Sequence, residues 1–146
     1  MVMRLDGSVA DDYDVAGMLQ HLRFADDGAM TFGGVDGARE LFFHDCDEAT
    51  VKWAFERLCA ERGGETSSKP VSVPRFWAAE MPRSYIRCLQ DRAKPRWLSD
   101  VVVERLGVEA LTIDASHSPF LSRPAELAEL LVYATTTKPV GPLLPD

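Results

Sequence analysis

Apolar residues recur at helical spacing in three segments of the chain. The first stripe predicts a helix over about 47–61, in which the apolar positions are Val51, Ala54, Phe55, Leu58 and Cys59. The second predicts a helix over 96–106 with Gly107 as its C-terminal stop, and the third a helix from Pro124 to about 134. A shorter helix near 12–22 is plausible from the spacing of Val15, Met18, Leu19 and Leu22.

Polar residues at the helix starts refine these predictions. Asp45, with Glu48 three residues later, resembles a capping box for the helix over 47–61. Ser122 suits the N-cap of the last helix, and Pro124 suits its first turn.

Two β-rich runs alternate with the last two helices. Ser84–Leu89 and Val108–Ile113 predict short strands, so residues 84–134 form a strand–helix–strand–helix pattern. This alternation favours an α/β fold with parallel strands and a right-handed crossover. Functional groups of open α/β sheets gather at the carboxyl ends of the strands. Asp91 and His117 each come just after one of the two predicted strands.

The rest of the chain shows little regular patterning. Residues 1–40 are interpreted as mostly irregular, with turns at Asp26-Asp27-Gly28 and over 33–37, and residues 63–75 as a polar connector. The expected organisation is a cap-like, mostly helical and irregular segment over 1–75, an α/β unit over 76–134 and a flexible tail over 135–146.

Composition and charge exclude several classes of protein. The chain has 146 residues with 16 Lys and Arg against 23 Asp and Glu, and all of the acidic excess lies in residues 1–68. This acidity argues against a nucleic acid or an anionic membrane as the main partner. No signal peptide and no apolar run long enough to span a membrane are found. The three cysteines, Cys46, Cys59 and Cys88, contain no CxxC pair, which favours reduced, mostly buried thiols in a cytoplasmic protein.

Asp91 and His117 are the candidate catalytic pair. On loops at the same edge of adjacent strands, the carboxylate can accept a hydrogen bond from one imidazole nitrogen, and the other nitrogen is then free to act as a general base. Ser118-Pro119 would hold the loop after His117 out of helical geometry. The residues alone leave open a structural role, with a solvated aspartate and a histidine that stabilises its loop.

Four stretches carry a resemblance to a known family. Pro82–Pro95 (PRSYIRCLQDRAKP) resembles the acid-bearing strand and loop of α/β-hydrolases, specifically of the salicylate methylesterase and hydroxynitrile lyase subgroup. Val108–Pro124 resembles the histidine loop and final helix of that subgroup, and Glu40–Thr50 resembles its cap. Arg4–Gly7 is similar to the loop by which the chain enters that cap.

This resemblance implies a partial α/β-hydrolase fold. Asp91 would be the acid and His117 the base of a Ser-His-Asp triad that hydrolyses a small ester or amide, and cyanohydrin cleavage would be a variant of the same chemistry. The family's nucleophile lies in a G-x-S-x-G elbow upstream of the acid. The sequence contains no such motif, and none of its upstream serines has the context of an elbow: Ser8, Ser67, Ser68, Ser72 and Ser84.

The absence of the nucleophile half changes the expected function. The chain is expected to be inactive alone and either to pair with a separate N-terminal hydrolase fragment or to self-associate, since two parallel strands do not make a stable sheet. A non-catalytic binding or interaction domain that retains part of the fold is the alternative.

Other candidate sites are weaker. His44-Asp45-Cys46-Asp47 could suggest a metal site, but contiguous ligands rarely complete a tetrahedron, so we interpret it as a turn with an N-capping acid and expect no metal or cofactor. Cys46 lacks an obvious base. Four aromatic residues could line a pocket under the cap or pack in a core: Trp53, Phe55, Phe76 and Trp77. The basic residues beside Asp91, namely Arg92, Lys94 and Arg96, are expected to be solvated.

Overall fold

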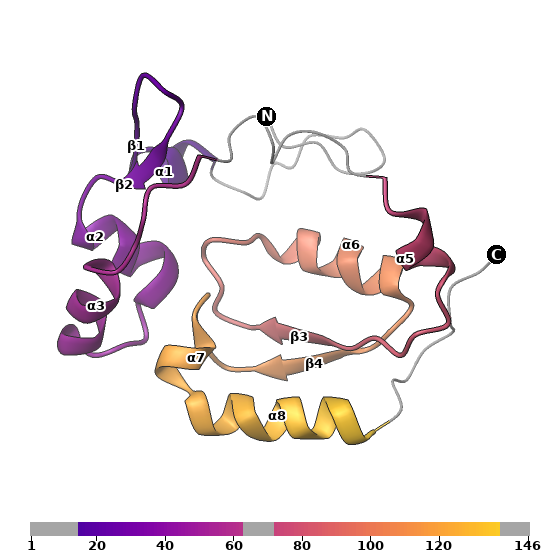
Figure 1. The fold of residues 1–146 in the computed structure, drawn as a ribbon. Coiled ribbons are helices and arrows are strands. Elements are labelled where there is room, and N and C mark those ends of the chain that lie inside the picture. The colour runs from indigo at the N-terminus through magenta and orange to yellow at the C-terminus, as the bar shows by residue number, and fades with distance from the viewer. Residues whose placement is uncertain (1–14, 63–71, 138–146) are drawn as a thin grey trace.

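A computed structural model describes residues 15–62 and 72–137 (Figure 1). In residues 15–62, which we call the N-terminal segment, the elements are α1 (Val15–Leu19), β1 (Leu22–Phe24), β2 (Met30–Phe32), α2 (Val35–Ala38), the π-helix η1 (Arg39–Phe43) and α3 (Glu48–Phe55). In residues 72–137, the strand unit, they are α5 (Pro74–Ala78), β3 (Tyr85–Cys88), α6 (Arg96–Leu106), β4 (Ala110–Ile113), α7 (Pro119–Ser122) and α8 (Pro124–Thr136).

The strand unit has the predicted order of strand, helix, strand and helix. β3 and β4 pair in parallel, with Tyr85 opposite Ala110 and Cys88 opposite Ile113. Figure 1 shows α6 and α8 on opposite sides of this strand pair. The prediction for α6 is confirmed to the residue, because Gly107 ends the helix at a φ of 63°, a left-handed conformation that glycine adopts without strain.

The N-terminal segment lies at the carboxyl ends of β3 and β4 (Figure 1). Its first part differs from the sequence-based expectation, because β1 and β2 form an antiparallel pair around the turn at residues 25–29, in a region predicted to be irregular. The helix predicted near 12–22 ends at Leu19, and Leu22 instead begins a strand. Four apolar positions cannot stabilise a helix alone, so strand pairing decides the conformation of Leu22.

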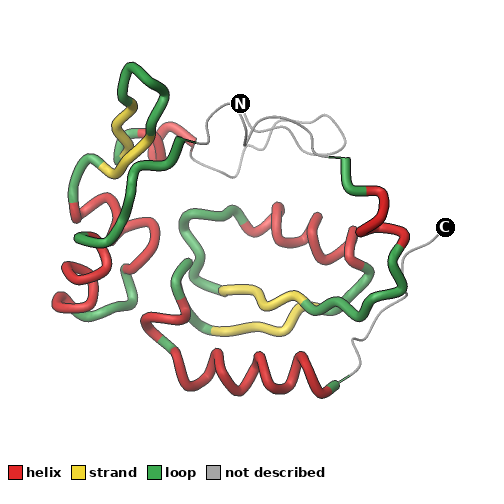
Figure 2. The backbone as a smooth tube through the Cα atoms, in the orientation of Figure 1, coloured by secondary structure: helices red, strands yellow, loops and turns green. Residues whose placement is uncertain are grey.

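The helix predicted over 47–61 is shorter than expected. Its N-cap is Asp47, whose side chain accepts a hydrogen bond from the Thr50 amide at 2.8 Å, so the predicted capping role of Asp45 is wrong. The helix ends at Phe55, and the chain then extends until Glu61 exchanges backbone hydrogen bonds with Met30. Pairing with the hairpin therefore replaces the expected last helical turns (Figure 2).

The described core joins the two parts of the chain. One buried cluster lies in the N-terminal segment and consists of Ala38, Phe43, Val51 and Ala54, and Ile113 and Ala115 of the strand unit are buried as well. Leu121 of α7 packs against the cluster of the N-terminal segment, so α7 is anchored to that segment. Ser122 belongs to α7, and the N-cap of α8 is Arg123 without a side-chain cap, which corrects the prediction for Ser122.

Several predictions fall wholly or partly outside the described residues. These include the stretch Arg4–Gly7, Ser8, Ser67, Ser68 and most of the tail after Thr137. The structure describes the connector predicted over 63–75 only from residue 72 onward. Its last two residues, Pro74 and Arg75, belong to α5. Within the described residues, no helix is both long enough and apolar enough to cross a membrane.

Candidate active site

The loops after β3 and β4 lie side by side. Leu89 donates a backbone hydrogen bond to Ile113 at 2.9 Å, and Gln90 donates one to Ala115 at 3.0 Å, so pairing continues beyond the strands. We call residues 89–95 the acid loop and residues 114–118 the base loop. Parallel pairing carries both loops to the same edge, as the sequence predicted.

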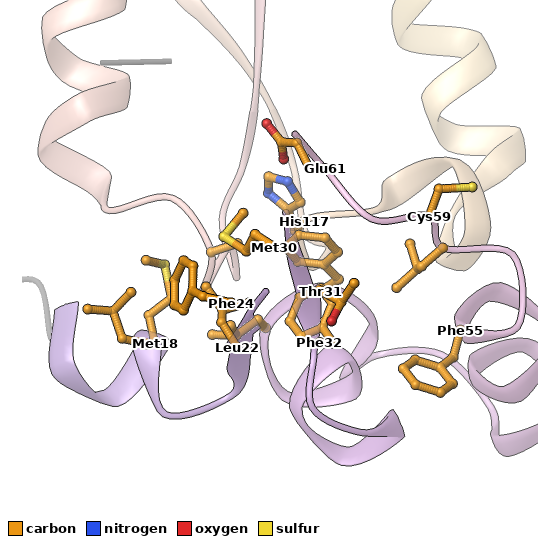
Figure 3. A pocket seen from close by; sticks show the side chains of 15 residues that line it. Met18, Leu22, Phe24, Met30, Thr31, Phe32, Phe55, Cys59, Glu61 and His117 are labelled. Atoms are coloured by element: carbon orange, nitrogen blue, oxygen red, sulfur yellow. The ribbon is translucent and has the colours of Figure 1, made fainter. Parts of the chain in front are cut away.

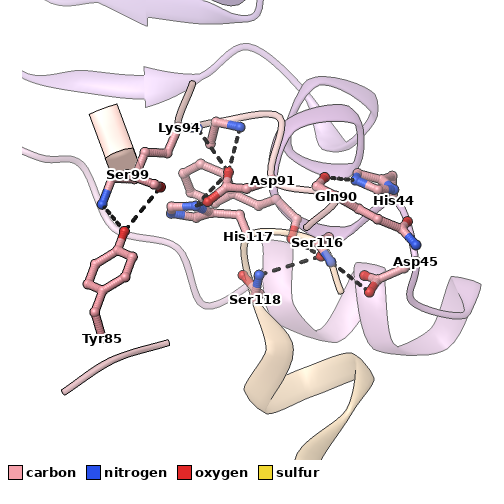
Figure 4. Close-up of polar contacts among 12 residues, drawn as sticks. His44, Asp45, Tyr85, Gln90, Asp91, Lys94, Ser99, Ser116, His117 and Ser118 are labelled. Carbon is pink, nitrogen blue, oxygen red and sulfur yellow. Dashed lines mark hydrogen bonds and ion pairs between the residues drawn. The ribbon is translucent and has the colours of Figure 1, made fainter. Parts of the chain in front are cut away.

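Asp91 and His117 are in direct contact across these loops (Figure 4). The Nδ1 atom of His117 lies 2.9 Å from Oδ2 and 3.1 Å from Oδ1 of Asp91. The Asp91 side chain is 14% exposed and the His117 side chain 37% exposed. Because a carboxylate can only accept, Nδ1 is the donor, and this contact fixes both the tautomer and the orientation of the neutral ring.

Asp91 is held as a carboxylate. Burial by itself raises the pKa of this side chain, but the hydrogen bond and charge of His117 and the backbone amides of Lys94 and Ala93 outweigh burial, so the pKa lies below its ordinary value. Both amides donate to Oδ1 at 2.9 Å. Asp91 therefore organises its own loop and also faces the imidazole as an anion.

The face of His117 is covered by an aromatic ring. The Phe42 ring lies 4.7 Å from the imidazole, centroid to centroid, at an interplanar angle of 31°. No described residue is hydrogen-bonded to Nε2 of His117. The ring is thus held at Nδ1 and on one face, which suits a group that accepts a proton at Nε2.

His117 also lines an apolar pocket of about 720 Å³ (Figure 3). The other lining residues come almost entirely from the N-terminal segment: Met18, Leu19, Leu22, Phe24, Met30, Thr31, Phe32, Leu41, Phe42, Phe55, Leu58, Cys59 and Glu61, with Ala93 from the acid loop. The pocket therefore combines a titratable group with a hydrophobic wall, a common arrangement in small-molecule sites.

Only one of the four aromatic candidates lines this pocket. Phe55 does so, whereas Trp53 is 51% exposed and carries the Arg57 guanidinium over its ring. Phe76 and Trp77 contact each other edge to face in α5. Sequence reasoning missed the contribution of the β1–β2 hairpin because it had predicted no strands there.

The side chains of the cluster His44-Asp45-Cys46-Asp47 contact different parts of the chain. The Nε2 atom of His44 donates to the Gln90 carbonyl at 2.9 Å, Asp45 accepts from the Ser116 amide at 2.9 Å, and Asp47 caps α3. In the described ranges, no three His, Cys, Asp or Glu residues are grouped so that they could hold a metal ion.

The thiols and the basic residues also have defined environments. Burial and the adjacent Asp45 raise the pKa of the Cys46 thiol, which disfavours it as a nucleophile. Cys59 is exposed, contrary to the expectation of mostly buried thiols. Two of the basic residues beside Asp91 have polar partners: Arg92 pairs with Glu40 at 2.6 Å, and Lys94 donates to the Tyr85 hydroxyl at 2.7 Å.

Comparison with known proteins identifies the architecture. No family model and no curated protein matches the chain. Among solved structures, a pyrethroid hydrolase from Sphingobium faniae JZ-2 matches with a TM-score of 0.65 and 20% identity over 88% of this chain and 53% of that chain. The pyrethroid hydrolase PytH with BIF matches with a TM-score of 0.63 and 20% identity, over 88% and 52% of the two chains.

The fold is about half of an α/β-hydrolase. This confirms the predicted fold class, a partial α/β-hydrolase fold with parallel strands. At this level of identity the similarity establishes the fold alone, and the chain spans about half the length of the hydrolases that it matches.

Proposed function

We propose that this chain supplies the acid, Asp91, and the base, His117, of a Ser-His-Asp ester hydrolase. The observation that carries the proposal is the 2.9 Å contact between Nδ1 of His117 and the Asp91 carboxylate, at the carboxyl ends of parallel strands and beside an apolar pocket. The α/β-hydrolase fold is compatible with this chemistry, but the proposal rests on the geometry of the Asp91–His117 pair.

The proposed division of labour follows from the hydrogen bonds. Nε2 of His117 takes the proton from a serine hydroxyl as the serine attacks the carbonyl carbon, and Asp91 stabilises the resulting imidazolium through Nδ1. His117 then returns the proton to the leaving alcohol or amine, and a second cycle with water releases the acid.

The nucleophile and the oxyanion-hole donors would come from another segment, because the sequence contains no G-x-S-x-G elbow. Two serines upstream of Asp91 lie in the described residues. Ser72 precedes α5 and Ser84 precedes β3, so neither has the strand-to-helix turn of an elbow. That segment could belong to the same polypeptide or to a separate N-terminal hydrolase fragment.

Exposed apolar residues support association with such a segment. Phe120, Leu131 and Val132 of α7 and α8 are each at least half exposed. Among the described strands, β3 and β4 pair only with each other. An open strand edge and exposed helix residues favour either pairing with a nucleophile-bearing fragment or self-association.

The pocket favours an apolar substrate. A hydrophobic wall of aromatic, leucine and methionine side chains beside His117 suits an ester or amide with a bulky apolar group. The resemblance of residues 82–95 and 108–124 to the salicylate methylesterase and hydroxynitrile lyase subgroup supports small substrates. Cyanohydrin cleavage would use the same pair for proton transfer.

A complementation experiment tests the proposal. The chain is co-expressed with the half of the matched pyrethroid hydrolase that it does not cover, and hydrolysis of p-nitrophenyl butyrate is measured. We expect turnover only with both pieces, abolished by His117→Ala and retained by the control His21→Ala, whose histidine lies in the turn before β1.

Two outcomes would contradict the proposal. If the mixture hydrolyses the ester and His117→Ala does not reduce this turnover, His117 is not the base. Binding of the ester by the mixture without any turnover would favour the non-catalytic binding domain instead.

A further inference from the structure

One short segment of the chain holds the acid loop from the side of the N-terminal segment. It comprises residues 40–45, which are most of η1 and the turn after it, and we call it the 40–45 segment. His44 donates to the carbonyl of Gln90, next to Asp91, at 2.9 Å. Because a carbonyl cannot donate, this contact places the His44 proton on Nε2. The pair between Glu40 and Arg92 adds a second contact, but both side chains are half exposed and it contributes little.

The same segment holds the base loop more tightly (Figure 4). The Ser116 amide donates to Oδ2 of Asp45 at 2.9 Å, and the Ser116 hydroxyl donates to the Phe42 carbonyl at 2.9 Å. Ser116 has no exposed surface and Ser118 is 3% exposed, so the residues on both sides of His117 are buried. The direction in which His117 leaves the backbone is therefore fixed by its neighbours.

We propose that Asp45 is a positioning residue for the Asp91–His117 pair, acting through the backbone of Ser116. Its carboxylate has no recorded contact with the imidazole and is therefore not the triad acid. The Asp45 carboxylate accepts the hydrogen bond from the backbone amide of Ser116, a residue without exposed surface. This inference rests on the proposed function, because it concerns the same pair.

Removing the Asp45 carboxylate leaves a buried hydrogen-bond donor unsatisfied, which costs free energy. Without an acceptor at Asp45, the Ser116 amide must stay unpaired or turn toward water. Turning Ser116 moves the adjacent His117 away from Asp91, and a displacement of about 1 Å is enough to impair proton transfer. Burial raises the pKa of Asp45, but hydrogen bonds, chiefly those from Ser116, together outweigh burial, so the pKa lies below its ordinary value and the acceptor is a carboxylate at neutral pH.

The chain provides a matched control two residues away. Asp47 also accepts a backbone amide, that of Thr50 at 2.8 Å, but its contacts lie at the start of α3 and do not reach the base loop. Asp47→Ala therefore removes a comparable hydrogen bond from the same turn without touching Ser116. A general loss of stability would affect both alanine variants alike, whereas a positioning role affects only Asp45→Ala.

The experiment uses the full chain, labelled with ¹⁵N at histidine, and follows the His117 imidazole by NMR at alkaline pH. The measured quantities are the tautomer of the neutral ring and the solvent exchange rate of the Nδ1 proton, so no nucleophile is needed. We expect the Nδ1–H tautomer in the wild type. In Asp45→Ala we expect mixed tautomers and exchange that is about tenfold faster, as when a charge-assisted hydrogen bond is lost.

Three further variants keep the test decisive. Asp45→Asn retains an acceptor oxygen and is expected to stay within about twofold of the wild type, as is Asp47→Ala. Asp45→Glu keeps the charge but shifts the oxygens by one methylene, and it replaces Asp45→Ala as the test variant if the alanine variant does not fold. Faster exchange in the test variant, with wild-type behaviour in Asp45→Asn and Asp47→Ala, supports the inference.

The outcomes that overturn the inference differ from those that overturn the proposed function. A folded test variant with wild-type tautomer and exchange, or an Asp47→Ala variant that changes as much, overturns the role of Asp45. Asp91→Asn serves as the separate reference. If Asp91→Asn leaves the His117 resonances unchanged, the pair itself, and with it the proposed function, is wrong.

Discussion

Two substitutions of Asp91 remove different parts of its contacts. Asp91→Asn keeps one side-chain oxygen that can accept from the Ala93 and Lys94 amides, but it removes the negative charge and replaces the Oδ2 acceptor that faces His117 with an NH₂ group. Asp91→Ala removes the oxygen as well and leaves both amides without that acceptor. The difference in the free energy of unfolding between the two variants therefore measures what Asp91 contributes to its own loop.

The expected magnitudes follow from these contacts. Each amide hydrogen bond contributes about 1 kcal/mol net, so Asp91→Ala should be about 2 kcal/mol less stable than Asp91→Asn. His117 is 37% exposed, so solvent screens its contact with the charge, and Asp91→Asn should lose only about 1 kcal/mol at pH 7. The two effects sum to about 3 kcal/mol for Asp91→Ala, a large fraction of the stability of a small domain.

The assay is urea unfolding followed by tryptophan fluorescence, together with amide hydrogen exchange at Ala93 and Lys94. Both amides should exchange faster in Asp91→Ala and keep their protection in Asp91→Asn. Equal unfolding midpoints for the two variants, or equal exchange at both amides, would refute the reasoning.

The charge of Asp91 also predicts a pH dependence. Its pKa in the folded chain lies below the ordinary value of about 3.9, so its stabilisation is fully present above that pH and is lost as the pH falls through the folded value. Asp45 and Asp47 have lowered pKa values as well, but they are shared by the wild type and Asp91→Asn. The stability difference between these two proteins should therefore shrink on acidification, and a constant difference would contradict the assignment.

Three further predictions can be tested separately. His117→Ala should raise the pKa of Asp91, because fewer hydrogen bonds then oppose the effect of burial. The ¹³C shift of the Asp91 carboxyl during a pH titration measures this pKa, and an unchanged value would contradict the contact with His117. Gly107→Ala should cost about 1 kcal/mol in thermal unfolding because φ is 63° there, whereas the control Gly34→Ala, at an extended position with open space for a Cβ, should cost less. The chain alone should not turn over p-nitrophenyl acetate, and clear turnover abolished by His117→Ala would show that the nucleophile need not come from elsewhere.

The strand unit was predictable because local and tertiary signals agree there. α6 has an apolar stripe and a glycine at its end, and β3 and β4 are short β-rich runs separated by a helix. Alternating strands and helices have few possible topologies. The positions of Asp91 and His117 at one edge of the strand pair could therefore be predicted without information on side-chain contacts.

The N-terminal segment was less predictable because contacts distant in sequence decide its conformation. Leu22 pairs with Phe32 in the hairpin, and Met30 pairs with Glu61. The capping role fell to Asp47 rather than Asp45 because Asp45 accepts from Ser116, 71 residues later in the chain. No periodicity or spacing within residues 40–50 indicates that partner.

The contacts between the 40–45 segment and the two loops join residues far apart along the chain. The His44 contact spans 46 residues and the two Ser116 contacts span 71 and 74, whereas Asp91 and His117 are separated by 26. Loop-closure entropy makes such long-range contacts slow to form, so we expect them to form after the contact between Asp91 and His117. His117 should then reach its final orientation late in folding, and its imidazole resonances would report the arrival of the native state.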